Sequence, residues 1–171
     1  MKASGKNVSN RKKREKDNVL EKTRDIASDL SRLGSFDEIL EYLITYVTQT
    51  LEAERGSLFL HDPAAHQLYT RVALGNLSRE IRIDEQSGIA GWVFMNAEAT
   101  IVNSPYKDER FNKEVDERTG YQTKSLICVP IFSTGDIPIG VLQVLNKQTW
   151  RFTKADLAKI ELVASQCAST L

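Results

Sequence analysis

The residues best suited to hold a small anion lie in the segment SGIAG, where Gly88 and Gly91 bracket Ile89 and Ala90. An apolar helical pattern follows this segment. The N–H groups at a helix start have no partner inside the helix, so those of Ile89 and Ala90 could bind a phosphate, aided by the helix dipole. The same spacing also fits a tight turn in which the glycines only permit close packing, and from these residues alone packing is favoured.

A second group of polar residues, Asp116, Thr119 and Thr123, precedes two apolar runs at Ser125–Phe132 and Ile139–Leu145. Both runs are rich in Val and Ile and are joined by STGDIP, which has the chemistry of a turn, so they predict an antiparallel hairpin. A polar loop in front of a rigid hairpin commonly forms the mouth of a pocket. These three side chains are therefore candidates to face a ligand.

Catalytic motifs are absent from the sequence: there is no P-loop, HExxH, GxSxG or CxxC. Asp108, Glu109, Asp116 and Glu117 could supply paired carboxylates. Basic residues are interspersed among them, which favours a solvated, charge-balanced loop. A binding module is expected rather than an enzyme.

Histidines and cysteines suggest no metal centre and no disulfide. His61 and His66 flank a predicted turn with no further His or Cys nearby, so surface positions are expected rather than metal ligation. Cys128 lies in an apolar strand and Cys167 in a helical pattern. Both are expected to be reduced core residues of a cytosolic protein.

Charge balance excludes a strong whole-chain field, since 23 basic residues face 23 acidic ones among 171. Binding to nucleic acid or to an anionic membrane is not expected. The run RKKRE at 11–15 lacks interleaved aromatics and fits a solvated leader. No apolar run approaches the 18 or so residues of a membrane span.

A heptad pattern precedes the main domain. Five residues follow spacings of 4, 3, 4 and 3: Val19, Thr23, Ile26, Leu30 and Leu33. This pattern fits a parallel coiled-coil dimer, and equally a helix that packs on its own domain. Gly34 ends the pattern, and Ser35 with Glu38 forms a capping box for the next helix.

Strands are predicted at Gly56–His61, Gln67–Ala73 and Glu80–Ile83, with a short edge strand at Ala99–Asn103. A short helix ends at Gly120. A terminal helix begins at a second capping box, Thr153 and Asp156, and its core face runs through Leu157, Ile160, Ala164, Cys167, Ala168 and Leu171. Because that helix is still apolar at its last residue, it is expected to lead into an output domain. The order predicts an α+β domain with one antiparallel sheet of about six strands, helices on one face and ligand-binding loops on the other.

Four segments together resemble a GAF domain: SLFLHD at 57–62, SGIAGWV at 87–93, DERTGYQTKSLICVPI at 116–131 and GVLQVLNK at 140–147. The similarity is greatest to the cyclic-nucleotide-binding GAF domains of phosphodiesterases and cyanobacterial adenylyl cyclases. It covers residues 35–171 and implies the GAF fold. Residues 1–34 are then a polar leader with a linker helix.

The resemblance extends to the family's Asn-Lys, Phe, Asp-Glu signature, here Asn146, Lys147, Phe152 and Asp156, with Leu157 in place of the final Glu. It implies an ion pair between Lys147 and Asp156 that holds the pocket shut. It also implies a set of ligand contacts: Ser57 and Ala73 on the pocket floor, N–H groups of Ile89 and Ala90 on the phosphate, Asp116, Thr119 and Thr123 from the lid, and Gln143, where relatives often carry Glu. Leu74 stands where some cGMP-binding relatives have Asp, which favours cAMP over cGMP.

The expected function is that of a cytoplasmic regulatory domain that binds a cyclic nucleotide, with no other cofactor and no metal. Lid residues 104–123 would close over the ligand and shift the terminal helices, which would relay the change to a catalytic output domain. A homodimer through the terminal helices is expected. Two alternatives stay open: a GAF dimerisation or sensor module of a signalling kinase that binds no nucleotide, and a methionine sulfoxide reductase, which would need an exposed reactive cysteine.

Overall fold

A computed structural model describes residues 34–74, 80–133, 136–149 and 151–171. The chain divides into two compact units, residues 1–39 and residues 40–171. The predicted leader and heptad helix lie outside the described residues, as does Gly135 of the hairpin turn. The sheet and the candidate site belong entirely to the second unit.

One antiparallel sheet of six strands forms this unit, in the order β3-β2-β1-β6-β5-β4. The strands are β1 (Ala53–Asp62), β2 (Gln67–Ala73), β3 (Arg82–Asp84), β4 (Thr100–Val102), β5 (Leu126–Phe132) and β6 (Pro138–Lys147). The predicted sheet and its hairpin, β5–β6, are confirmed. β1 is longer than predicted and β3 begins two residues later, at Arg82.

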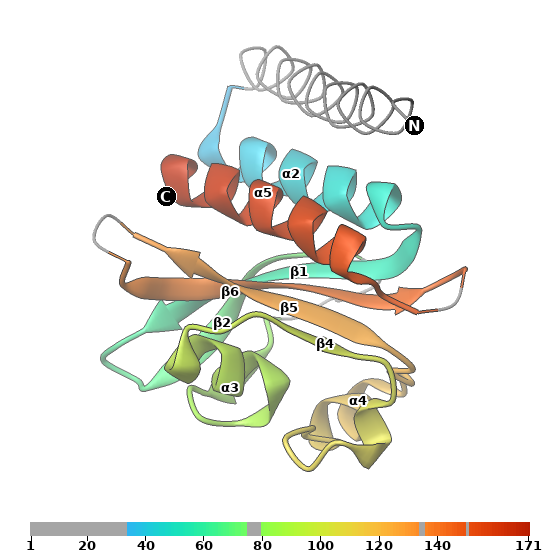
Figure 1. Ribbon diagram of the computed structural model, residues 1–171. Helices are drawn as coiled ribbons and strands as arrows, with labels where there is room; N and C mark the ends of the chain where they lie inside the picture. Colours follow the sequence, from blue (N-terminus) through green and yellow to red (C-terminus); the bar gives the residue numbers. More distant parts are fainter. Residues whose placement is uncertain (1–33, 75–79, 134–135, 150) are drawn as a thin grey trace, which may run out of the picture. The chain divides into compact units, whose positions relative to one another are not determined.

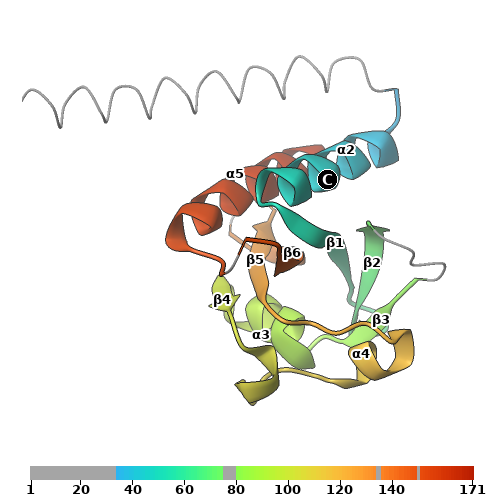
Figure 2. The same ribbon diagram turned by 90° about the vertical axis from the view of Figure 1, so that its right-hand side faces the viewer.

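Two long helices, α2 (Phe36–Thr50) and α5 (Lys154–Thr170), run along one face of the sheet (Figure 1). The other face carries α3 (Gly88–Asn96), the 3-10 turn η1 (Pro105–Lys107) and α4 (Glu114–Thr119), as Figure 2 also shows. This is the predicted division between a helical face and a face of loops and short helices. Strands β1 and β6 at the centre of the sheet separate the two layers.

Both predicted capping boxes are present. The Ser35 N–H donates to Glu38 Oε2 at 2.9 Å, and the Glu38 N–H donates to Ser35 Oγ at 3.3 Å. Thr153 and Asp156 make the reciprocal pair at the start of α5. These side chains satisfy backbone donors that the first turn of a helix leaves unpaired, so the sequence dictates where the helices begin.

Apolar residues of each helix face the sheet. Leu40, Leu43, Ile44 and Val47 of α2 are buried, and Ile160, Val163, Ala164 and Cys167 of α5 are buried. Leu171 is 40% exposed and Leu157 only partly buried, so the core face of α5 is shorter than predicted and includes Val163. Gly56 permits α2 to approach β1, because a Cβ there would clash with the side chains of Thr48 and Ile44.

A separate apolar cluster fills the space between the sheet and α3. It contains Phe59, Leu68, Ile89, Ala90, Val93, Phe94, Val102, Leu126, Cys128 and Val141. Cys128 therefore belongs to the core on the α3 side, whereas Cys167 belongs to α5. Both thiols are free and buried, as the sequence predicted.

Candidate functional site

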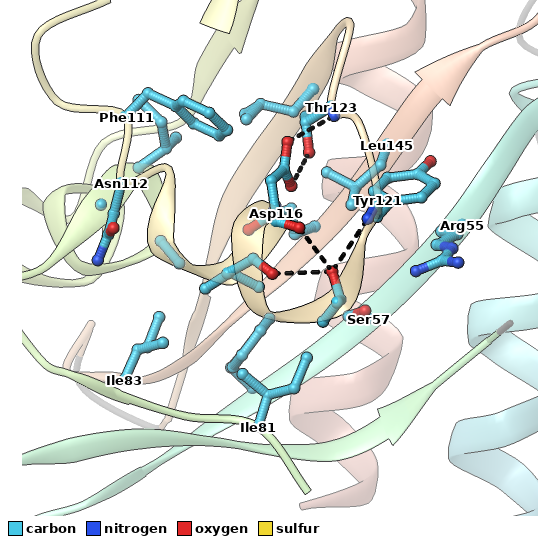
Figure 3. A pocket seen from close by; sticks show the side chains of 18 of the residues that line it. Arg55, Ser57, Ile81, Ile83, Phe111, Asn112, Asp116, Tyr121, Thr123 and Leu145 are labelled. Carbon is cyan, nitrogen blue, oxygen red and sulfur yellow. Dashed lines mark hydrogen bonds between the residues drawn. The ribbon is translucent and has the colours of Figure 1, made fainter. Parts of the chain in front are cut away.

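A cavity of about 90 Å³ lies between the sheet, the start of α3 and the segment that carries α4 (Figure 3). Its floor is built by β1 and β6, in which Ser57 pairs with Gln143 and Arg55 with Leu145. Directly paired residues of an antiparallel ladder point to the same face of the sheet. Nineteen residues line the cavity: Arg55, Ser57, Phe59, Ile81, Ile83, Ser87, Gly88, Ile89, Ala90, Phe111, Asn112, Val115, Asp116, Thr119, Tyr121, Thr123, Leu126, Gln143 and Leu145.

Most of the expected ligand contacts meet at this cavity. Seven line it: Ser57, Ile89, Ala90, Asp116, Thr119, Thr123 and Gln143. Ala73 and Leu74 do not. Ala73 pairs with Ser57 and so lies one strand further out, on β2, while the Leu74 N–H donates to Gly56 O at 2.8 Å. A ligand contact by these two residues stays a prediction, which the lining of this cavity does not support.

The start of α3 presents unpaired donors to the cavity. Its first helical hydrogen bond runs from the Gly91 N–H to Ser87 O, so the N–H groups of Ile89 and Ala90 have no acceptor among the described residues. Ser87 is the N-cap residue of α3 but makes no capping bond with its side chain; its hydroxyl accepts from Asn112 Nδ2 at 2.8 Å. Ile89 and Ala90 are 3% and 4% exposed, so little water other than that in the cavity can satisfy these two amides.

Asp116 of α4 is buried, at 6% exposure. Its Oδ2 accepts from the Thr123 N–H at 2.7 Å and the Tyr106 hydroxyl at 3.0 Å, and its Oδ1 accepts from Thr123 Oγ1 at 2.8 Å. The bond to Asp116 raises the pKa of Tyr106. The prediction of a solvated carboxylate is wrong for Asp116, because three donors compensate its burial; it holds for Glu109 and Glu117, which are exposed.

The hydroxyl groups of the two lid threonines donate their hydrogen bonds to acceptors within the lid. Thr123 Oγ1 donates to Asp116, and Thr119 Oγ1 donates to Val115 O at 2.8 Å, one turn earlier in α4. Each hydroxyl has a single proton. In this arrangement both hydroxyl protons are used within the lid and the lone pairs can still accept, so donation by these threonines to a ligand stays a prediction.

Tyr121 joins the end of the lid to β1. Its ring lies 3.8 Å from the Arg55 guanidinium carbon, and its hydroxyl donates to Glu54 Oε2 at 2.9 Å. Burial and the bond to Glu54 raise the pKa of Tyr121 well above its ordinary value. The hydrogen bond from Asn146 lowers the pKa of Glu54, so the tyrosine stays protonated and the carboxyl ionised at neutral pH.

Asn146 binds the segment between the lid and β5. Its Oδ1 accepts from the Lys124 N–H at 2.7 Å and the Ser125 N–H at 3.3 Å. Its Nδ2 donates to Gln122 O at 2.9 Å and Glu54 Oε2 at 3.0 Å. The residue has a φ of 56°, a conformation that Asn adopts more readily than most residues. All four hydrogen-bonding positions of the amide are therefore used.

Lys147 forms the expected ion pair with Asp156, at 3.1 Å, and its Nζ also donates to Leu51 O at 3.0 Å. Burial alone would raise the pKa of Asp156, but Thr153 and Lys147 together lower it. Phe152 is held through its backbone by Asn103, at 2.9 and 3.2 Å. None of these residues lines the cavity. The ion pair instead fastens the end of β6 to the end of α2 and the start of α5.

His61 and His66 meet at one carboxylate. His61 Nε2 lies 2.6 Å from Glu85 Oε2, and His66 Nδ1 lies 3.0 Å from Glu85 Oε1. The bond to His61, followed by that to His66, lowers the pKa of Glu85. His66 is exposed as predicted, whereas His61 is partly buried with its ring 4.5 Å from Phe94. Within the described parts of the chain, no group of three or more His, Cys, Asp or Glu is placed to hold a metal ion.

Sequence reasoning missed four polar residues of the cavity: Arg55, Ser87, Asn112 and Tyr121. Strand alternation could have found Arg55, because it lies two residues before Ser57 and must share its face. Nothing local marks Tyr121, which reaches the cavity only because the chain turns at Gly120, in a left-handed conformation with φ 67°.

Comparison with known proteins identifies the family of this chain. The family model described as "GAF domain" matches residues 35–171. The chain belongs to the GAF domain family. It is 36% identical over 165 residues to a probable 3′,5′-cyclic phosphodiesterase, pde-5, of Caenorhabditis elegans, covering 90% of this chain and 22% of that protein. It is 35% identical over 150 residues to the dual 3′,5′-cyclic-AMP and -GMP phosphodiesterase 11 of Drosophila melanogaster, covering 78% of this chain and 10% of that protein.

Solved GAF domains share the fold. The GAF domain of a phosphoenolpyruvate-protein phosphotransferase from Coxiella burnetii superposes with a TM-score of 0.79 at 18% identity, covering 90% of this chain and 92% of that one. The free methionine-R-sulfoxide reductase of Neisseria meningitidis superposes with a TM-score of 0.72 at 17% identity, covering 85% of this chain and 83% of that one. At such identities the likeness concerns the fold alone. No helix in the described part of this GAF domain has the length and apolar character needed to cross a bilayer.

Proposed function

We propose that this GAF domain is a regulatory module that senses a cyclic purine nucleotide. The observation that carries the proposal is the pair of N–H groups without an acceptor at Ile89 and Ala90, two residues that line a cavity with both apolar and polar side chains. Two amides at a helix start can replace the water around a cyclic phosphate without a cation. The similarity to phosphodiesterases named for cyclic nucleotides supports the same ligand class.

Ligand binding requires the lid to move. A cavity of about 90 Å³ is smaller than the roughly 300–1,000 Å³ typical of ligand pockets. The segment from η1 to Tyr121 lines the cavity and is held to β1 by the bond from the Tyr121 hydroxyl to Glu54. When this segment opens and closes around a ligand, the hydrogen bonds of Asn146 and Lys147 would change. Through these bonds, ligand binding would shift α2 and α5.

In the full-length protein, the terminal helices would pass this change to a catalytic output domain, as the similarity to phosphodiesterases suggests. A homodimer through terminal helices and a cytoplasmic location belong to the same proposal. Leu74, in place of the Asp of some cGMP-binding relatives, is the ground from sequence for cAMP over cGMP.

The small cavity also favours a second candidate, a GAF domain that binds no nucleotide and serves as a spacer. The reductase alternative has less support, because both cysteines are buried. Burial raises the pKa of Cys128 far above its ordinary value and that of Cys167 to about 12, and a thiol that stays protonated is a poor nucleophile.

Isothermal titration calorimetry of the 171-residue chain with cAMP and cGMP tests the proposal, together with native mass spectrometry for a ligand that co-purifies. Binding of either nucleotide is expected, and Gln143→Leu should weaken it by about 1–2 kcal/mol because a floor amide is lost. Gln148→Leu, at an exposed amide outside the cavity, is the matched control. If neither nucleotide binds and none co-purifies, the sensor proposal is rejected and the alternative, a GAF domain that serves as a spacer, is favoured.

A further inference from the structure

The side chain of Asn112 connects the loop before α3 to the first residue of α4. Its Nδ2 donates to Ser87 Oγ at 2.8 Å, and its Oδ1 accepts from the Glu114 N–H at 2.9 Å. The side chain is partly buried and lines the cavity (Figure 3). Because the amide group is planar and rigid, both bonds form only when Ser87 and the Glu114 N–H keep fixed relative positions.

The start of α4 depends on this bond from Asn112. The helix has six residues, and Lys113 at its N-cap makes no capping bond with its side chain. So short a helix is marginal by itself, and its first N–H groups need acceptors outside the helix. Asn112 supplies the acceptor for Glu114. Asn112 therefore helps to set the position of α4, the lid helix that contributes Asp116 to the cavity.

The backbone next to the candidate anion site approaches Asn112 closely. A Cβ on Gly88 would lie 3.4 Å from the Cβ of Asn112. Gly88 has a φ of 70°, in the left-handed region that favours glycine. Since Gly88 directly precedes the Ile89 and Ala90 amides, a group bound to these amides lies next to the segment that Asn112 contacts.

Few contacts join the lid to α3 and its leading loop. Among the described residues, the bond from Asn112 to Ser87 is the one hydrogen bond between lid residues 104–123 and residues 85–96. The Arg110 guanidinium also lies over the Trp92 ring, 4.3 Å from its centroid, but Trp92 does not line the cavity. At the cavity itself, Asn112 thus makes the polar link between the two segments.

The cavity beside this link has a buried polar group without a partner. Ser57 is 7% exposed and lines the cavity, and its hydroxyl has no hydrogen-bond partner among the described residues. A buried hydroxyl of this kind gains from a polar ligand. Together with the free amides at the start of α3, Ser57 indicates that a ligand completes the site.

We propose that Asn112 is a positioning residue that couples occupancy of the anion site to the order of α4. An anion on the amides at the start of α3 restrains Ser87 and, through Asn112, the Glu114 N–H. The lid is then held at α4 as well as at Tyr121. This inference rests on the proposed function and names the route by which binding at α3 reaches the lid.

Hydrogen exchange of single backbone amides, followed by NMR on the 171-residue chain, tests the inference with saturating cAMP or cGMP, whichever binds more tightly. In the wild type the nucleotide is expected to slow exchange at Ile89 and Ala90 and also at Glu114. Ser87→Ala removes the partner of Asn112 but keeps the Glu114 bond. In this variant the slowing at Ile89 and Ala90 should persist, while the slowing at Glu114 falls on the order of tenfold.

Three further variants serve as controls. Asn112→Ala removes the amide itself and should give the same loss, and its combination with Ser87→Ala should give no further loss, since the two residues act through one bond. Ser87→Thr keeps a hydroxyl and should retain the slowing at Glu114, which a general loss of packing would not explain. Ser165→Ala removes an exposed hydroxyl on α5 and should leave exchange at both places as in the wild type.

The outcomes distinguish this inference from the proposed function. If a nucleotide binds but does not slow Glu114 in the wild type, or slows it equally in Ser87→Ala, the coupling role of Asn112 is rejected and the sensor remains. If neither nucleotide binds the wild-type chain, the proposed function fails and the inference fails with it.

Discussion

The side-chain amide of Asn146 connects three parts of the domain: its own strand β6, the neighbouring β1 through Glu54, and residues 122–125 at the end of the lid. Asn suits this position because it tolerates a positive φ and offers acceptors and donors on one planar group. A carboxylate has acceptors only, so Asp cannot make the two bonds that Nδ2 makes.

Asn146→Asp is therefore expected to lower the free energy of unfolding by about 1–3 kcal/mol, because a second carboxylate would face Glu54 and Gln122 O without a donor. Urea denaturation measures the change. Gln148→Glu makes the same chemical change two residues away at an exposed side chain and should have little effect. Equal midpoints for Asn146→Asp and the wild type would contradict the role given to Asn146.

Asp156 gives the fold a dependence on pH. Its pKa in the folded domain lies below the ordinary value, so its stabilising effect is complete above the unfolded pKa of about 3.9 and is lost as the pH falls through the folded value. Asp156→Asn should reduce stability at pH 7 by roughly 1–3 kcal/mol and flatten the acid side of the stability profile. Thermal unfolding from pH 7 to pH 3 would show this, with Asp136→Asn in the exposed turn as the control. If the stability of Asp156→Asn falls with decreasing pH in parallel with that of the wild type, the ion pair is not the cause of the loss of stability in acid.

Among the elements, α3 shows how a glycine positions the candidate phosphate site. A Cβ on Gly91 would lie 2.7 Å from Gln86 C and 2.8 Å from Glu85 O. These are backbone atoms of the loop that leads into the helix, so they cannot move without moving the start of α3. Gly91 thus sets how closely that loop packs on the helix that presents the Ile89 and Ala90 amides.

Gly91→Ala is expected to destabilise the domain by about 1–3 kcal/mol through overpacking. Helix propensity alone would favour Ala by about 1 kcal/mol, so the sign of the measured change decides between the two effects. Gly34→Ala is a suitable control, because a Cβ there meets its nearest atom at 3.7 Å. A stabilised Gly91→Ala variant would mean that the loop can move aside freely.

The lid is the second element with a testable bond. Thr123→Ala removes the hydroxyl that donates to buried Asp116, and a stability loss of about 1–3 kcal/mol is expected, since a charged buried group loses a donor. Under the proposed function it should also weaken nucleotide binding, through a less well-held lid rather than a lost ligand contact. Thr149→Ala, at an exposed threonine that bonds Glu52, is the control. A variant with wild-type stability would show that Asp116 does not depend on Thr123.

For the whole molecule, the heptad pattern at residues 19–33 predicts a dimer. Sedimentation velocity of the full chain should give a dimer, and the same measurement on residues 34–171 should give a monomer. Identical sedimentation behaviour of the two chains would reject the coiled coil and favour a helix that packs on its own domain.

The sequence by itself determined the order of elements, both capping boxes, the antiparallel hairpin and the placement of seven lining residues at one cavity. Local patterns suffice for the elements and their caps, since alternation sets the face of a strand and a capping residue sets the start of a helix, whereas the resemblance to GAF domains indicated the set of lining residues. Only the tertiary structure decided that Asp116 is buried, that the threonines donate within the lid, that Arg55 and Tyr121 stack, and that Ala73 lies a strand away. These features depend on contacts between segments far apart in the chain, where sequence spacing does not determine which atoms meet.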